Sequence, residues 1–249
     1  MISENSHKVS IVLPTFNGAR YIQESIASCL NQTFKNFELI VIDDGSTDNT
    51  LEKVKFFKDD RLKFIGLPTN QGHIAALNKG FSLATGDLLT WTSDDNYYAR
   101  NALGEMVDVL DTNKGVDFVY TKYQVIDSEG EPLRIGRFED PDYLDVDNCI
   151  GGCFLYRRKV YETIGDFNPE AFLAEDYEYW LRVRQKFHMK KLDKVLYFYR
   201  VHEKSLTGLH REEKVQEQVQ KIRDKFVPKW KRLLMKIISR KFAIRVRSC

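Results

Sequence analysis

The sequence predicts an α/β protein in which helices flank both faces of a doubly wound, mixed sheet. In the first hundred residues, short apolar runs alternate with segments whose apolar residues recur at helical spacing. That order is typical of parallel strands joined by right-handed crossover helices. After about residue 112 the alternation ends, and strands, turns and helices follow in mixed order. The second half therefore either completes the same sheet or forms a subdomain over it.

Each element expected in the first half has a local signal. The strands are short apolar runs, and each helix has either apolar residues on one face or an acidic first turn that suits its dipole. The expected strands are 9–13, 38–42, 62–65 and 88–91, and the expected helices are 20–30, 48–57 and 73–84.

The second half is less regular. Residues 118–125 predict one or two strands before a turn at 127–130, and residues 134–150 show no regular pattern. The remaining expected elements are a strand at 153–156, helices at 159–164 and 175–184, and a last strand at 195–199.

Size and composition indicate a globular domain. The chain has 249 residues, 43% of them hydrophobic, which is enough for a real core. We expect one domain at 1–210, with halves at 1–112 and 113–210, and a tail at 211–249. No apolar stretch reaches the roughly 18–20 residues of a spanning helix, and the polar start is unlike a secretory signal. Four irregularly placed cysteines, interpreted as reduced thiols, complete the prediction of a cytoplasmic protein.

The charge of the chain is unevenly distributed. Residues 221–249 carry eleven Lys or Arg and one acidic residue, a net +10 that leaves −8 on residues 1–220. Apolar residues interleave with these charges, as in basic amphipathic helices that lie on anionic membranes. We expect peripheral association with the inner face of the cell membrane, and the alternative is a helix packed on the body. No nucleic-acid partner is expected, because no recognisable module accompanies the tail.

Two adjacent carboxylates, Asp94 and Asp95, follow the apolar run 88–91. Ligands of open α/β sheets bind at the carboxyl ends of strands. Two close carboxylates favour a cation, and oxygen ligands suit Mg²⁺ or Mn²⁺. The alternative is an acidic turn that caps the next helix.

Two other strand ends carry polar residues, without a glycine-rich phosphate loop. After the first strand, Thr15 offers a hydroxyl and Phe16 offers a ring that can stack on a base. After the second strand, the carboxylates of Asp43 and Asp44 can accept hydrogen bonds from a base and a ribose. Packing of the turns and capping of the next helix are the alternatives.

These segments, with others in the same order, resemble the motifs of family 2 glycosyltransferases, which are inverting enzymes with the GT-A fold. The resemblance spans about residues 8–207. The matching segments are 10–17 (SIVLPTFN), 41–48 (VIDDGSTD), 70–72 (NQG), 78–80 (NKG), 84–87 (ATGD), 91–96 (WTSDDN), 152–158 (GCFLYRR), 164–167 (IGDF), 175–182 (EDYEYWLR) and 200–205 (RVHEKS).

The resemblance implies a GT-A-like fold whose first half binds a nucleotide sugar, expected to be a UDP-sugar, and whose second half binds the acceptor. The segments 70–72, 78–80 and 84–87 would flank the donor. The acceptor would be a hydroxyl of a saccharide or lipid-linked saccharide, in cell-surface polysaccharide or glycolipid synthesis. Donor contacts are implied for Pro14, Thr15, Phe16, Asn17, Asp43, Asp44, Asn70, Gly72, Asn78, Lys79, Asp94 and Arg200.

The resemblance also implies the catalytic groups. Asp176, with Glu175 beside it, would be the general base, since adjacent carboxylates repel and raise one pKa. A capped helix N-terminus is the alternative for this pair. Asp94 and Asp95 would hold Mg²⁺ or Mn²⁺, with His202 as a further ligand. The family's acidic motif usually begins with an Asp, and here that position is Thr92.

Two other functions remain open at the level of sequence. A nucleotidyltransferase would use a similar nucleotide-binding sheet, but it would normally have a glycine-rich, basic first loop, unlike residues 14–20. A non-catalytic protein that binds sugar nucleotides is the second, which the Thr92 departure keeps open.

Overall fold

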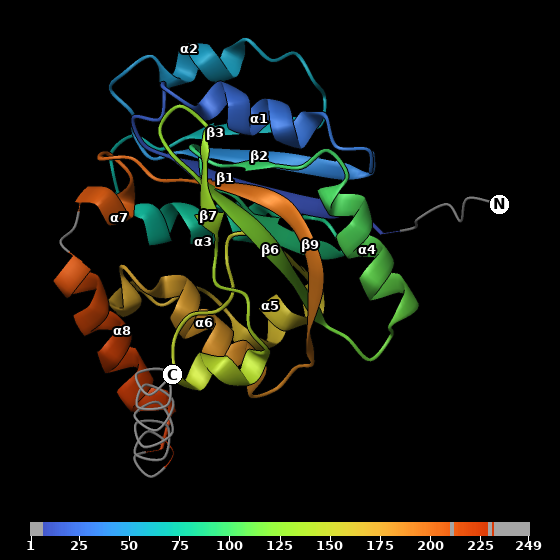
Figure 1. Ribbon diagram of the computed structural model, residues 1–249. Helices are drawn as coiled ribbons and strands as arrows, with labels where there is room; N and C mark the ends of the chain where they lie inside the picture. The colour runs from blue at the N-terminus through green and yellow to red at the C-terminus, as the bar shows by residue number, and fades with distance from the viewer. Residues whose placement is uncertain (1–6, 210–211, 229–230, 232–249) are drawn as a thin grey trace.

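The computed structural model describes residues 7–209, 212–228 and 231, and a nine-stranded mixed sheet runs through its middle (Figure 1). The strands lie in the order β3-β2-β1-β4-β8-β6-β9-β5, and β7 pairs with β6 outside this path. The second half of the chain therefore completes the sheet begun by the first half.

All seven elements expected in the first half are present. The four strands are parallel neighbours: β1 (Val9–Thr15), β2 (Phe37–Asp43), β3 (Leu62–Gly66) and β4 (Leu88–Trp91). The helices between them are α1 (Ile22–Leu30), α2 (Thr50–Lys55) and α3 (His73–Leu83). Two further elements were not expected, β5 (Tyr97–Tyr98) and α4 (Ala102–Thr112).

The second half differs more from expectation. Residues 134–150 are not wholly irregular, since they include the end of a strand and a 3-10 turn, and the last strand begins six residues earlier than expected. The strands are β6 (Phe118–Ile126), β7 (Pro132–Ile135), β8 (Phe154–Arg157) and β9 (Met189–Arg200). The helices are η1 (Pro141–Asp145), α5 (Arg158–Ile164), η2 (Pro169–Ala171), α6 (Glu175–Arg184), α7 (Leu206–Leu209) and α8 (Glu212–Phe226).

The strand directions collect the carboxyl ends of six strands at one edge of the sheet. β8 is antiparallel to both β4 and β6, so β6 runs in the same direction as β4. β9 is parallel to β6, and the short β5 is antiparallel to β9. The turns that follow β1, β2, β4 and β9 therefore lie near one another, where ligands of α/β sheets bind.

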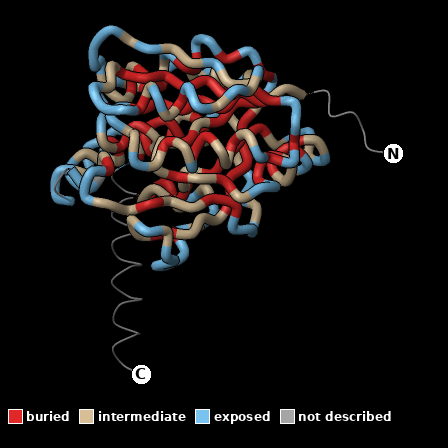
Figure 2. Tube along the Cα trace, turned by 90° about the horizontal axis from the view of Figure 1, so that it is seen from above, coloured by how far each residue is buried: buried red, intermediate tan, exposed pale blue. Residues whose placement is uncertain are grey.

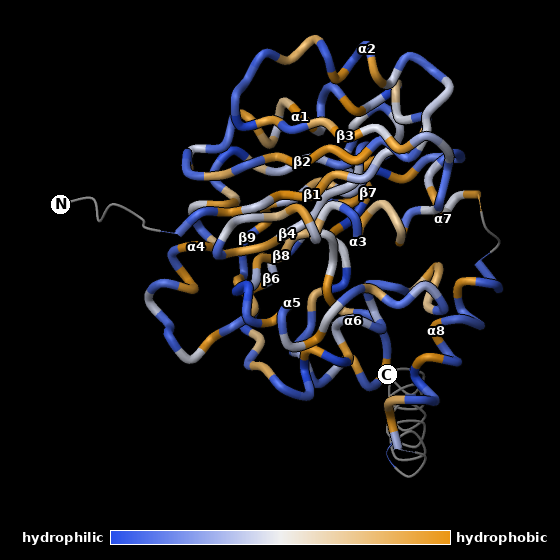
Figure 3. The backbone as a smooth tube through the Cα atoms, turned by 180° about the vertical axis from the view of Figure 1, so that it is seen from behind, coloured by the Kyte–Doolittle hydropathy of each residue, from blue (hydrophilic) through white to orange (hydrophobic). Residues whose placement is uncertain are grey.

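Two hydrophobic layers hold the helices to the sheet. On one face, apolar side chains of the sheet pack against α1, α2 and α4. On the other face they pack against α3, α5, α6 and α8. Figure 2 shows the buried residues concentrated in the interior of the molecule, and Figure 3 shows long hydrophobic stretches in β1 and β2. Burial on both faces explains why β1 and β2 consist mostly of apolar residues.

At the opposite, amino-terminal edge of the sheet, the carboxylate of Glu38 ties together the starts of four strands. One oxygen accepts hydrogen bonds from Ser10 Oγ at 2.6 Å and from the Thr85 N–H and hydroxyl, both at 2.7 Å. The other lies 2.7 Å from Lys63 Nζ and 3.2 Å from Lys8 Nζ. Burial alone would raise the pKa of Glu38, but hydrogen bonds from Lys63, Ser10 and Thr85 lower it far below its usual value.

The first part of the basic tail packs on the body. Val219 and Ile222 of α8 are buried in the layer that also contains α6, and Lys231 forms an ion pair with Asp145. The rest of the predicted amphipathic stretch, residues 229–230 and 232–249, lies outside the described residues, so membrane association stays a prediction. Within the described part of the chain, no helix is long and apolar enough to cross a membrane.

Candidate active site

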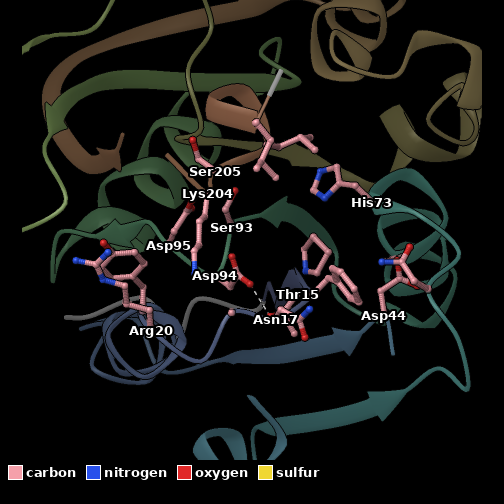
Figure 4. A pocket seen from close by; sticks show the side chains of 18 of the residues that line it. Thr15, Asn17, Arg20, Asp44, His73, Ser93, Asp94, Asp95, Lys204 and Ser205 are labelled. Atoms are coloured by element: carbon pink, nitrogen blue, oxygen red, sulfur yellow. Dashed lines mark hydrogen bonds between the residues drawn. The ribbon is translucent and has the colours of Figure 1, made fainter. Parts of the chain in front are cut away.

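A cavity of about 460 Å³ opens where β1, β2 and β4 end (Figure 4). We call it the donor cavity, because most of the residues predicted to contact the donor line it. The ring of Phe16 at this cavity is 46% exposed, so its face is accessible to a planar group. The predicted residues that line the cavity are Pro14, Thr15, Phe16, Asn17, Asp44, Asn70, Gly72, Asp94, Asp95 and His202.

Hydrogen bonds to main-chain N–H groups fix the loops of the donor cavity. The buried carboxylate of Asp44 accepts from Gln71 N at 2.7 Å and from Gly72 N at 2.8 Å. Asn17, whose φ of 55° is unusual for a residue other than glycine, accepts from Thr47 N at 2.8 Å. These side chains shape the cavity before any ligand arrives.

Asp94 and Asp95 lie side by side at the floor of the donor cavity. Thr15 donates its hydroxyl to Asp94 Oδ2 at 2.5 Å, and His202 Nε2 lies 3.0 Å from Asp95 Oδ2. A Cβ on Gly18 would come within 2.1 Å of Asp94 Oδ2, so only glycine permits this approach. Burial, and then repulsion from Asp95, raise the pKa of Asp94 to about 7.

Thr92, the departure from the family pattern, does not face the donor cavity. Its side chain is fully buried, and its hydroxyl lies 2.8 Å from the hydroxyl of Tyr197. Thr92 lines neither cavity described here. The residue that replaces the family's usual Asp therefore lies in the protein core and not at the donor cavity.

The acidic pair fits a divalent cation in part. Asp95 Oδ1 is buried and accepts no hydrogen bond from the described residues. Burial and repulsion from Asp95 disfavour the ionised form of Asp94. However, no three His, Cys, Asp or Glu side chains of the described chain form a group that could hold a metal ion. A bound ion would need further oxygen ligands from water or a substrate, as Mg²⁺ commonly does.

A second cavity of about 340 Å³ adjoins the first, and we call it the acceptor cavity after the prediction that the acceptor binds beside the catalytic carboxylates. Both predicted catalytic carboxylates, Glu175 and Asp176 at the start of α6, line it. The two cavities share the residues His73, Ser93, Asp95, Ser205 and Leu206.

Asp176, the predicted general base, is held by a hydrogen bond in a buried position. Asn148 Nδ2 donates to Asp176 Oδ2 at 2.8 Å, and Asn148 Oδ1 accepts from Ile150 N at 3.1 Å, which fixes the orientation of the amide. Burial, and then repulsion from Glu175, raise the pKa of Asp176 to about 6. Burial also raises the pKa of Glu175. A carboxyl poised near neutrality is effective in proton transfer.

His73, the first residue of α3, lines both cavities, and Figure 4 shows its side chain at the donor cavity. Its Nε2 lies 3.6 Å from Glu175 Oε1, and its ring meets the edge of Trp91 at 5.7 Å. Burial lowers the pKa of His73 to about 4, so the imidazole is neutral at physiological pH.

Four predicted donor residues are not brought to either cavity. Asp43 accepts from Ser46 N within its own turn. Asn78 and Lys79 lie further along α3, where Asn78 exchanges two hydrogen bonds with the main chain of Phe167. The guanidinium of Arg200 is buried against Glu24 and main-chain carbonyls.

The segment 84–87 also lies away from the donor cavity. It precedes β4, at the amino-terminal edge of the sheet, where Thr85 binds Glu38 and the carboxylate of Asp87 accepts from Lys8 N. The expectation that this segment flanks the donor is therefore wrong, because α3 carries the chain back across the sheet before β4 begins.

Sequence reasoning missed several residues of the site. Arg20 and Lys204 line the donor cavity and supply its positive charge, and Asn148 and Trp91 line the acceptor cavity. Arg20 and Lys204 stand within or next to matched segments, so a signal existed for them. Asn148 has none, because its partner Asp176 is distant in sequence.

Comparison with known proteins gives the family. The model of glycosyl transferase family 2 matches residues 10–165. The chain belongs to glycosyl transferase family 2. An uncharacterized glycosyltransferase of Rickettsia conorii is 34% identical over 190 residues, which cover 70% of this chain and 31% of that protein. The chain thus spans less than a third of the length of this curated relative.

Two further likenesses name substrates of other proteins. Escherichia coli WfgD, a UDP-Glc:alpha-D-GlcNAc-diphosphoundecaprenol beta-1,3-glucosyltransferase, is 30% identical over 182 residues, covering 72% of this chain and 70% of WfgD. The structure of S. aureus TarS 1-349 with UDP-GlcNAc has a TM-score of 0.72 at 23% identity, covering 86% of this chain and 65% of that one.

A third likeness is to a protein solved with a metal ion. The mannosyltransferase PcManGT from Pyrobaculum calidifontis, in complex with GDP-Man and Mn²⁺, has a TM-score of 0.63 at 20% identity, covering 80% and 59% of the two chains. At these identities the two solved structures show the fold alone, and this fold is GT-A-like.

Proposed function

We propose that this protein is an inverting glycosyltransferase that moves a sugar from a nucleotide-sugar donor to a hydroxyl of a saccharide or lipid-linked saccharide. One observation carries the proposal. A cavity lined by the family's donor motifs shares a wall with a cavity that contains a carboxyl whose pKa is raised to about 6. Family membership supports the same activity.

The donor cavity suits a nucleoside diphosphate. Phe16 offers a face for the base, and Arg20 and Lys204 offer positive charge for the diphosphate. The transferred sugar would then lie at the wall shared by the two cavities, next to His73 and Asp95. A UDP-sugar is the donor we propose, as it is for WfgD by name.

Asp176 would take the proton of the acceptor hydroxyl. As that oxygen bonds to the anomeric carbon, the bond from this carbon to the diphosphate breaks on the opposite face, so a single displacement inverts the centre. Asn148 holds the carboxylate of Asp176 in place, and burial, with repulsion from Glu175, keeps the pKa of Asp176 raised.

The departing diphosphate needs electrostatic stabilisation. Asp94 and Asp95 would hold Mg²⁺ or Mn²⁺. His202 lies beside the carboxylate of Asp95 and would be a further ligand. Such an ion, when bound, would stabilise the charge of the leaving diphosphate. Arg20 and Lys204 would add fixed positive charge, whether or not an ion is present.

The experiment that tests the proposal measures binding and hydrolysis of UDP-, GDP- and dTDP-sugars with and without Mn²⁺. We expect one donor to bind in a metal-dependent way and to release its nucleoside diphosphate slowly. Asp95→Ala should remove the dependence on metal, and Asp59→Ala, outside both cavities, should not. Binding of no donor would overturn the proposal, and binding without transfer to a broad acceptor panel would leave a sugar-nucleotide-binding protein.

The biosynthetic role that we propose for the reaction rests on the relatives alone. WfgD acts on a diphosphoundecaprenol-linked sugar, as its name states. We propose by analogy that the acceptor here belongs to cell-surface polysaccharide or glycolipid synthesis.

A further inference from the structure

Helix α8 lies against the two segments of the chain that carry the proposed general base and its hydrogen-bond partner. Its buried residues Val219 and Ile222 share a hydrophobic layer with α6, which begins with Glu175 and Asp176. Figure 1 shows α8 beside α6. These apolar contacts account for the docking of the helix, and its polar contacts reach the connections around the base.

The polar contacts of α8 are made to the main chain of these connections. Arg223 donates a hydrogen bond from Nη1 to the carbonyl oxygen of Val146, which stands two residues before Asn148. Gln218 Nε2 donates to the carbonyl oxygen of Glu170 at 2.6 Å, in the turn η2 that leads into α6. Because both acceptors belong to the backbone, these contacts fix the course of the chain and do not merely fill space.

A buried carboxylate connects the same turn to α6 and to the chain that follows α8. Asp145, the last residue of η1, is 3% exposed and pairs with Arg184 of α6 and with Lys231. Burial alone would raise the pKa of Asp145, but hydrogen bonds from Arg184 and Lys231 lower it, so the carboxylate is ionised at neutral pH. Tyr177 Oη also donates to the carbonyl oxygen of Leu144 at 2.6 Å. The turn is therefore held from two sides.

Asn148 links this turn to the active site. Its Nδ2 donates to Asp176 Oδ2 at 2.8 Å, and its Oδ1 accepts from Ile150 N at 3.1 Å. The amide can meet Asp176 only while the backbone around it keeps its position. A hydrogen bond to a carboxylate favours the ionised form. Displacement of the turn should therefore raise the pKa of Asp176.

We infer that Arg223 and Lys231 are positioning residues for the general base Asp176. They fix the turn at 145–148, and this turn holds Asn148 against the carboxylate. The inference rests on the proposed function and deepens it, since it assigns a role in proton transfer to two residues that line neither cavity. Helix α8 thus supports the transfer step without contact with either substrate.

Other titratable groups face Asp176 from three elements. Glu175 of α6, His73 of α3 and Tyr123 of β6 interact with it electrostatically. The described contacts of the two positioning residues are made to other side chains and to the main chain. A change at either positioning residue therefore reaches Asp176 through the turn and not through these three groups.

The first test follows the ionisation of Asp176 in the full chain. Arg223→Met and Lys231→Met each remove one contact and keep a long side chain. In each, the pKa of Asp176, measured by ¹³C NMR of its carboxyl group and assigned with Asp176→Asn, should rise by about 0.3–0.8 units. The transfer rate should fall about two- to fivefold at pH 5.5 and match the wild type at pH 9, with donor affinity unchanged. Lys214→Met, an exposed position of α8 with the same change of charge, is the control.

A double-variant comparison separates positioning from other effects. If Arg223 acts through Asn148, Arg223→Met should have no further effect on the pKa of Asp176 in protein that already carries Asn148→Ala. A direct effect of the lost charge on Asp176, or a general loosening of the fold, would add to that of Asn148→Ala. An additive effect, or an unchanged pKa in both Met variants, would overturn the inference. The same comparison with Lys231→Met gives the result if Arg223→Met folds poorly.

Failure of this inference and of the proposed function give different results. The NMR titration needs no donor, so it tests the positioning on the free protein. A raised pKa of Asp176 in the Met variants, without sugar transfer from any donor to any acceptor by the wild type, would leave the positioning and remove the transferase. Normal transfer with an unchanged pKa in both Met variants would keep the transferase and remove the inference.

Discussion

The donor and acceptor cavities share a wall but are built on opposite principles. In the donor cavity the polar side chains are already paired: Asp44 and Asn17 bind main-chain N–H groups, and Thr15 donates to Asp94. At the acceptor cavity, the lining residues Trp91, Trp180 and Glu175 each keep a buried polar atom that has no partner among the described residues. The loops of the donor cavity are thus held by hydrogen bonds of the chain itself, whereas the wall of the acceptor cavity retains unpaired buried groups.

This difference suggests separate roles for the two cavities. On the proposed function, the nucleotide would be bound by loops whose shape is fixed by the chain itself, which reduces the ordering cost of binding. The acceptor would meet the buried carboxyl of Asp176, whose raised pKa suits proton transfer. We therefore expect changes in the first region to alter donor affinity, and changes in the second to alter turnover and acceptor choice.

The largest effect is expected from Asp176→Asn. It removes the proposed base but keeps the shape and an acceptor for the Asn148 amide, so the transfer rate should fall about 10²–10⁴-fold. Donor affinity should stay unchanged, because Asp176 lines only the acceptor cavity. Steady-state release of nucleoside diphosphate and donor titration would measure the two quantities. Asp166→Asn, outside both cavities, is the control, and near-normal turnover of Asp176→Asn would refute its role.

A smaller effect, on donor affinity, is expected from Asp44→Ala. The two main-chain N–H groups of Gln71 and Gly72 lose their acceptor, so the loop before α3 loses its fixed shape. Donor affinity should fall roughly tenfold or more, and calorimetric titration with the nucleoside diphosphate would measure it. If donor affinity were unaffected, the preorganised character of the donor cavity would have to be abandoned.

Asp94→Asn should stabilise the free protein. A carboxyl whose pKa is raised on folding favours the folded state at low pH, and that contribution is lost as the pH rises through about 4 to 7. The variant should therefore gain roughly 1–2 kcal/mol in free energy of unfolding at pH 7.5, while it loses donor affinity. Denaturant unfolding at pH 4.5 and pH 7.5 would show it. An equal change at both pH values would contradict the assigned cause.

The smallest effect is expected from Asn148→Ala. Loss of the hydrogen bond to Asp176 disfavours the carboxylate and raises its pKa further. The acid limb of the transfer rate, expected near pH 6 in the wild type, should move upward by less than about one unit. At pH 9 the rate should change little. Asn168→Ala, a cap of η2 outside both cavities, should leave the profile in place.

Much of the donor side was predictable, because its signals are local. The strands β1, β2 and β4 are apolar runs that end in polar residues, and the parallel order brings those ends together. Helix α4 was also open to prediction, since its buried residues Leu103, Met106, Val107 and Leu110 recur at helical spacing.

The acceptor side depends on tertiary structure. The first half of β9 is mostly exposed, and only its pairing with β6 makes it a strand, so no apolar run marks it. Likewise, Asn148 meets Asp176 through the folding of a long connection, and His73 reaches Glu175 from the other half of the chain. Arg200 shows the converse: it stands in a matched segment, but its charge is used inside the protein.

The hydrogen bonds and ion pairs around Glu38 affect how the protein unfolds in acid. The pKa of Glu38 is held far below normal in the folded state, so the carboxylate stabilises the fold at neutral pH. This contribution declines progressively as the pH falls below about 4.5, and it is lost completely only when the pH falls through the lowered pKa of the folded state. Protonation there releases Lys63 and Lys8, and weakens the ties to Ser10 and Thr85, at the edge remote from both cavities. The buried acids of the active site respond in the opposite sense, since protonation relieves them. Acid unfolding should therefore begin at the amino-terminal edge of the sheet, and amide hydrogen exchange should report opening there first. The edge that carries the two cavities should remain folded at that stage.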